Sequence, residues 1–91
     1  EKGSGGAMQV YPNPYSRRRH VEVVFARLPS RSTVQVYSVN GTLLSTLPAV
    51  ESGTSGSVCV WKPPRHVVPG MYLYTVRSSG KVSQGKLMVT P

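Results

Sequence analysis

The sequence predicts an all-β protein built as an antiparallel sandwich of about seven short strands. Apolar residues recur at every second position in short segments, which is the period of a strand with one buried face. Glycine, proline, asparagine and serine separate these segments about every eight to twelve residues, a spacing typical of Greek-key sandwiches. No segment longer than a turn has a helical period. We therefore expect an immunoglobulin-like or fibronectin-like sandwich, without an internal disulfide because Cys59 is the only cysteine.

The expected domain spans residues 9–91. Residues 1–8, "EKGSGGAM", are small and without pattern, and we interpret them as a linker or a cloning scar. No run approaches the roughly 20 apolar residues of a membrane-spanning helix, so we expect no transmembrane segment. No signal peptide is visible either, and we expect the chain to be something other than a complete secreted precursor.

The first half of the domain is expected to hold four strands. "MQVY" ends at Pro12-Asn13-Pro14, because proline fixes φ and lacks an N–H donor. "HVEVVFARL" follows, with Val21, Val23 and Phe25 on one face. "TVQVYSV" and "TLLSTL" flank Asn40-Gly41, the preferred pair for a two-residue hairpin turn in which both positions need positive φ. We expect these two strands to be neighbours in one sheet.

The second half is expected to hold three more strands. A polar loop, "PAVESGTSG", leads to "SVCVW", which ends at Pro63-Pro64 because prolines cannot join a ladder. "MYLYTVR" places Tyr72, Tyr74 and Val76 on one face. "SSGK" turns the chain, and "VSQGKLMVT" forms the last strand.

The charge of the chain is strongly positive. Eleven Lys and Arg residues against three acidic residues give a formal charge of +8, which favours acidic partners such as nucleic acid or anionic lipid. The densest cluster is Arg17-Arg18-Arg19-His20, which could contact phosphates. It lacks the aromatic and glycine pattern of an RNA-binding strand. We interpret it as a solvated loop, expect no nucleic-acid partner, and leave open whether Arg17–Arg19 has another partner.

One spacing suggests a nucleotide site. Gly80, Gly85 and Lys86 match the G-x-x-x-x-G-K pattern of a phosphate-binding loop. Such a loop needs Ser or Thr after the lysine and a helix that points its N-terminus at the phosphates. Leu87 follows the lysine here, and the segment alternates like a strand. We therefore reject a nucleotide site.

The remaining reactive residues do not form a catalytic or metal-binding pattern. Cys59, His20 and His66 have no spacing typical of zinc ligands, and a cysteine within a strand is by default an inert buried thiol. Glu22 and Glu51 are the only carboxylates of the domain, one in a strand and one in a loop. We expect no enzyme, no metal and no cofactor.

Four short motifs occur in a specific order along residues Gln9–Thr90. They are Tyr11-Pro12-Asn13-Pro14, Val36-Tyr37 before Asn40-Gly41, Pro69-Gly70-Met71-Tyr72, and Gly85-Lys86-Leu87 with Val89. Together they resemble the C-terminal sorting domain of type IX secretion cargo, and the related Ig-like module of the flagellar hook-capping protein. Lys62-Pro63-Pro64 after Trp61 departs from the glycine-containing loop of many relatives, which weakens the likeness to the hook-capping branch.

The resemblance implies a folded, non-catalytic sorting signal. It would direct an upstream cargo domain through the type IX outer-membrane translocon of a Gram-negative bacterium, for release or attachment at the cell surface. A sortase-like peptidase would then remove it and join the cargo to an anionic lipopolysaccharide. The residues that we expect to serve partner recognition are Pro69, Gly70, Tyr72, Gly85, Lys86, Leu87 and Val89.

The same residues have a purely structural interpretation in any Ig-like domain. Gly70 and Gly85 would permit tight backbone geometry, Tyr72 would fill the core, and Lys86 would keep an edge soluble. For the recognition role we expect the last strand to lie at a sheet edge that a partner can pair with, with Lys81 and Lys86 opposing aggregation.

Two other functions stay open. Trp61 and exposed tyrosines could stack on sugar, as in an accessory carbohydrate-binding or structural module of an extracellular enzyme, although a tryptophan in a small sandwich more often fills the core. A hook-cap-like assembly domain would instead associate weakly with itself.

Overall fold

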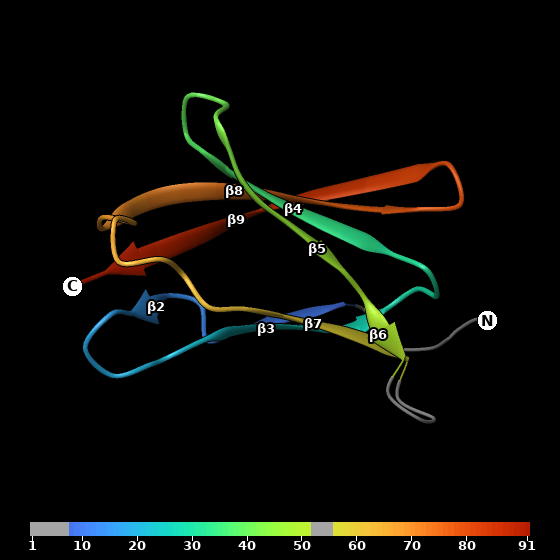
Figure 1. The fold of residues 1–91 in the computed structure, drawn as a ribbon, viewed down its shortest axis with the longest axis horizontal. Coiled ribbons are helices and arrows are strands. Elements are labelled where there is room, and N and C mark those ends of the chain that lie inside the picture. The colour runs from blue at the N-terminus through green and yellow to red at the C-terminus, as the bar shows by residue number, and fades with distance from the viewer. Residues whose placement is uncertain (1–7, 52–55) are drawn as a thin grey trace.

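The structure, a computed structural model, describes residues 8–51 and 56–91. In these residues nine strands form two sheets that pack face to face (Figure 1). One sheet has the order β1 (Gln9–Tyr11), β3 (Val23–Leu28), β7 (Ser57–Trp61), β6 (Val50–Glu51). The other has the order β2 (Tyr15–Ser16), β9 (Lys81–Thr90), β8 (Gly70–Ser78), β4 (Thr33–Ser38), β5 (Leu43–Pro48).

All neighbouring strands run antiparallel except β2, which pairs in parallel with β9. The all-β sandwich expected from the sequence is therefore confirmed. Within the two described ranges, no helix is long and apolar enough to cross a membrane.

The core lies between the two sheets and is built from the alternating positions. Tyr72, Tyr74 and Val76 are buried on one face of β8, as the period of two predicts. Tyr74 meets Phe25 of the opposite sheet edge-to-face, with ring centroids 5.2 Å apart. Burying such side chains is the main source of stability, since each one contributes roughly 1.5–3 kcal/mol.

The expected face of the strand before Leu28 is partly wrong. Val23 and Phe25 are fully buried, but Val21 is 78% exposed because β3 begins only at Val23. A bulge follows Phe25: this residue pairs with Cys59, whereas Leu28 pairs with Ser57. Arg27 takes a left-handed φ of 58° in the bulge, and the extra residue returns Leu28 to the core.

The hairpin expected at Asn40-Gly41 is confirmed, but the turn type expected there is wrong. β4 and β5 pair as expected. The Gly41 N–H donates to the Ser38 carbonyl at 3.0 Å, and the Ser38 N–H donates to the Thr42 carbonyl at 2.9 Å. Only Gly41 of the expected pair has a positive φ, 93°. The loop therefore holds three residues rather than two, with glycine at its left-handed position.

The two-residue turn with two positive φ values lies instead between β8 and β9. Ser79 has φ 50° and Gly80 has φ 79°, which is the geometry that matches the twist of the flanking strands. The turn predicted at "SSGK" is therefore present.

Two short strands were not predicted. β2 lies after the proline motif, and β6 lies inside the expected polar loop, whose residues 52–55 fall outside the described ranges. Each has two residues, which is too short to show a period of two. Both take part in pairing only because the fold brings a partner strand alongside.

Candidate recognition surface on the last strand

The last strand, β9, is the longest in the structure. It pairs with β8 without a bulge from Lys81 opposite Ser78 to Val89 opposite Gly70. Its side chains alternate, so Leu87 and Val89 are fully buried in the core while Lys86 is exposed on the outer face of the sheet. The strand is thus anchored through one face and open on the other.

Gly85 leaves room for a core tyrosine. It pairs with Tyr74 on β8, and a Cβ atom at Gly85 would overlap the Tyr74 hydroxyl and lie 2.5 Å from its Cζ atom. Burial raises the pKa of the Tyr74 hydroxyl above its ordinary value, so the ring sits there in the neutral form. Glycine at this position is therefore required by packing rather than by a turn.

A strap of residues 12–17 covers the second half of β9. Asn13 lies between two prolines, and its side chain substitutes for a strand peptide: Nδ2 donates to the Lys86 carbonyl at 3.0 Å, and Oδ1 accepts from the Met88 N–H at 3.1 Å. The Arg17 N–H then donates to the Thr90 carbonyl at 3.0 Å. The strap thus satisfies an edge that would otherwise be unpaired.

Three further contacts fix the strap and the loop that follows it. Ser16 Oγ donates to the Pro91 carbonyl at 3.0 Å. The Ser16 N–H donates to His20 Nδ1 at 2.9 Å, and the Tyr15 hydroxyl donates to the His20 carbonyl at 3.1 Å. His20 is therefore a structural histidine that closes the loop carrying the arginine cluster.

The outer edge of the first half of β9 has no strand partner among residues 8–51 and 56–91. In an antiparallel strand the N–H and C=O of one residue point to the same side, and this side alternates along the chain. Lys86 C=O and Met88 N–H point to the strap, so the backbone groups of Val82 and Gln84 point the same way. No strand of the described ranges pairs with them there. The expectation of a free last strand is thus correct for this half and wrong for the half beneath the strap.

Pro69, Gly70 and Tyr72 form the corner where the chain crosses between the sheets. The Tyr72 hydroxyl donates to the Val68 carbonyl at 2.6 Å, and the ring is buried. This is the arrangement of the tyrosine corner found in Ig-like sandwiches. Gly70 has φ 151°, in a region that residues with a Cβ rarely adopt. Pro69 is exposed beside it.

The structure separates the expected recognition residues into two groups. Lys86 and Pro69 are exposed, whereas Tyr72, Leu87 and Val89 are buried and face the core. The buried residues cannot touch a partner in the folded state, so any part they have in recognition is to hold the strand in place. Sequence reasoning missed Asn13 as a contact of β9, although the proline on each side of it was a usable clue.

The other chemical patterns of the sequence do not form sites. Gly80 lies in the β8–β9 turn and Lys86 within a strand, so the phosphate-loop spacing is a coincidence. Cys59 is buried, its Sγ atom donates to the Leu47 carbonyl at 3.5 Å, and burial raises the pKa of the thiol. Among the described residues there is no group of three His, Cys, Asp or Glu that could hold a metal ion.

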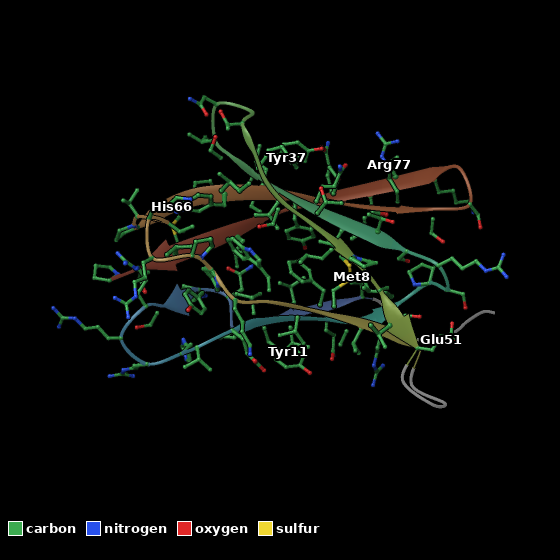
Figure 2. The ribbon with its side chains drawn as sticks, in the orientation of Figure 1. Met8, Tyr11, Tyr37, Glu51, His66 and Arg77 are labelled. Carbon is green, nitrogen blue, oxygen red and sulfur yellow. The ribbon has the colours of Figure 1, made fainter. Side chains whose placement is uncertain are left out.

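Trp61 is also unavailable for stacking on sugar. Its side chain is only 2% exposed, and Nε1 donates to Ser45 Oγ at 2.9 Å across the two sheets. It fills the core, as a tryptophan in a small sandwich usually does. Among the described residues Tyr11 is the most exposed tyrosine, and it lies on β1, the edge strand of the sheet that also holds Trp61 (Figure 2).

These features define a small Ig-like sandwich module with a clamped last strand. The chain belongs to the family of secretion system C-terminal sorting domains, whose family model matches residues 9–90. Domains of this family are sorting signals of the type IX secretion system and are in general non-catalytic, and the cargo of that system is secreted or surface-associated.

Solved structures show the same fold. The chain is similar to part of PorZ, an essential bacterial surface component of the type-IX secretion system of Porphyromonas gingivalis, with 22% identity and a TM-score of 0.74. The match covers 92% of this chain and 11% of the PorZ chain. CopC from Methylosinus trichosporium OB3b matches with 17% identity and a TM-score of 0.53, over 93% of this chain and 95% of that chain. No curated protein matches the chain in sequence.

Proposed function

We propose that the type IX translocon recognises this sorting domain by adding a strand to the free half of β9. The observation that supports this is the row of outward backbone groups at Val82 and Gln84, which have no strand partner in the part of the chain that the structure describes; the row ends where the strap begins. An added strand would supply main-chain hydrogen bonds, and alternating side chains would supply specificity. Lys86, exposed next to this edge, would contact the partner directly.

The other expected recognition residues support this contact. Gly85 permits close packing of β9 on Tyr74, and Leu87 and Val89 anchor the strand in the core. Gly70 and Tyr72 set the corner that starts the neighbouring strand β8, and Pro69 is the exposed residue of that corner. We propose that these residues position the edge, and that Pro69 and Lys86 meet the partner.

We further propose that the chain has no catalytic activity of its own and follows a cargo domain. A sortase-like peptidase would remove it, and the cargo would be joined to an anionic lipopolysaccharide on the outer surface of a Gram-negative bacterium. The resemblance of the motifs to type IX sorting domains supports this sequence of events, and the excess of cations would favour an anionic surface.

The test is a proline substitution that removes one outward N–H from the free edge. Gln84→Pro deletes such a donor without removing a hydrogen bond to β8. The matched control is Thr46→Pro: alternation across the ladder points the Thr46 N–H to the outer edge of β5, the other edge of the same sheet. Both variants are fused to a reporter cargo in a type IX-competent cell.

We expect Gln84→Pro to lose most secretion of the reporter and Thr46→Pro to keep it, with both purified domains folded by circular dichroism. Equal secretion by the two folded variants would defeat recognition through this edge. A deletion of residues 86–91 tests the sorting role of the last strand separately from recognition through its edge. Continued secretion of the reporter that carries this deletion would defeat that sorting role.

A further inference from the structure

A cluster of cations surrounds the turn between β8 and β9. A cavity of about 280 Å³ opens there, at the end of the sandwich where the hairpin meets the β3–β4 loop. Its lining includes three cations and three hydroxyls, contributed by Arg31, Arg77, Lys81, Thr33, Ser78 and Ser79. Figure 2 shows Arg77 at this end of the molecule and His66 at the opposite end.

The cavity is held in place by the fold. Arg77 and Thr33 face each other across the β4–β8 ladder. Ser78 Oγ donates to the Ser30 carbonyl at 3.0 Å, which ties the hairpin to the β3–β4 loop. Arg31 lies in that loop with a left-handed φ of 58°. Two segments that are distant in sequence, residues 30–33 and 77–82, are therefore joined around the same space.

No carboxylate of residues 8–51 and 56–91 lines this cavity. The two acidic residues of the described ranges are elsewhere: Glu22 precedes β3 and Glu51 ends β6, and neither lines the cavity. A neighbouring cavity of about 470 Å³ shares Ser78, Ser79 and Lys81, and its lining adds Arg27. Like charges held close together repel, so an anion bound among them would relieve that repulsion.

We propose that this cavity binds the phosphate group of a phosphorylated ligand. A guanidinium donates two parallel hydrogen bonds to phosphate oxygens, and hydroxyl and ammonium groups supply further donors to a tetrahedral anion. The arginine cluster at residues 17–19 has a similar charge but projects from an exposed loop, whereas the cations here line one pocket together with hydroxyl groups. A pocket of about 280 Å³ has room for a phosphate group.

The inference goes beyond the proposed function, because it concerns a ligand rather than strand pairing. Its test uses the 91-residue chain with pyrophosphate as the soluble probe, in calorimetry and in NMR titration. The site variant is Arg31→Asn/Arg77→Gln, in which asparagine tolerates the positive φ. The control variant is Arg18→Gln/Arg19→Gln, which removes the same charge from the exposed loop at the other end of the sandwich (Figure 1).

We expect saturable binding that weakens about tenfold in the site variant, as the loss of a charge-assisted hydrogen bond predicts, and stays within about twofold in the control. In the unmodified chain the amide shifts should concentrate at residues 31 and 78–82, which keeps the test valid if the site variant unfolds. Equal weakening in both variants, shifts centred on residues 17–20, or no saturable binding of any phosphate probe would overturn the proposal.

A second arm identifies the source of the phosphate. Phosphatidylcholine vesicles that contain phosphatidic acid present the same group on a lipid. Vesicle binding that is lost only in the site variant supports the site with a lipid ligand. Pyrophosphate binding without vesicle binding supports it with a soluble one.

Discussion

Replacing Gly85 with alanine tests whether packing against Tyr74 fixes the last strand. The new Cβ would overlap the Tyr74 hydroxyl and lie 2.5 Å from Cζ, and the ring cannot easily retreat because it is buried against Phe25. Overpacking of a core costs about 1–3 kcal/mol. Alanine would regain about 0.5–1 kcal/mol in strand preference over glycine. We expect Gly85→Ala to lower the free energy of unfolding by about 1–2 kcal/mol.

The assay is urea unfolding followed by circular dichroism. With a slope of about 1 kcal/mol/M for a small domain, the midpoint should fall by about 1–2 M. In a Tyr74→Leu background the ring is gone, so the same alanine should be neutral or stabilising, with a coupling energy of about 1 kcal/mol or more. An unchanged midpoint for Gly85→Ala, or the same loss in both backgrounds, would refute the packing argument.

Two further substitutions test the contacts around the strand. Asn13→Ala removes both side-chain bonds of the strap, so we expect a loss of about 1 kcal/mol and faster hydrogen exchange at the Met88 amide. Asn13→Asp keeps the oxygen that accepts from the Met88 N–H, so it should protect that amide from exchange better than Asn13→Ala does. Equal exchange at Met88 in the unmodified chain and in both variants would contradict the role of the strap. Tyr72→Phe removes the 2.6 Å bond to the Val68 carbonyl, and urea unfolding should show a loss of about 1 kcal/mol. Tyr11→Phe, at an exposed ring, should leave the midpoint unchanged, and an equal change in both would argue against the corner.

The strap gives the family motifs a shared structural meaning. The motif Tyr11-Pro12-Asn13-Pro14 at the start of the domain and the motif Gly85-Lys86-Leu87 at its end are about 75 residues apart. The Asn13 side chain nevertheless forms hydrogen bonds with the backbone of Lys86 and Met88. The sequence alone offers them as two separate resemblances. The fold shows that the first motif covers the edge of the second and thereby sets how much of β9 is left open.

Most of the seven longer strands could be predicted because they have enough residues to show a period, whereas β1, with three residues, was recognised from the proline motif that ends it. Val34 and Val36, for example, are fully buried at alternating positions of β4. The period of two predicted the wrong buried positions where the backbone leaves the regular ladder. Val21 continues the alternation in sequence but precedes the strand, and the bulge at Arg27 shifts the buried position by one residue to Leu28.

The recognition surface could be predicted only in outline. The resemblance selected residues on β8 and β9, but it did not separate exposed Lys86 from buried Leu87, which alternation along one strand places on opposite faces. Nor could it place Arg31, Arg77 and Lys81 around one cavity, because they come from one loop and two ends of strands. Such clusters depend on which strands become neighbours.

The sequence by itself determined the class of fold, the inward face of most strands and the family, since these depend on local period, turn residues and ordered motifs. Tertiary structure alone decided which half of the last strand is covered, why Gly85 must lack a side chain, and where the cations gather. The physical reason is that a hydrogen bond such as Asn13 to Lys86, or a clash such as Gly85 with Tyr74, exists only after two distant segments have been brought into register.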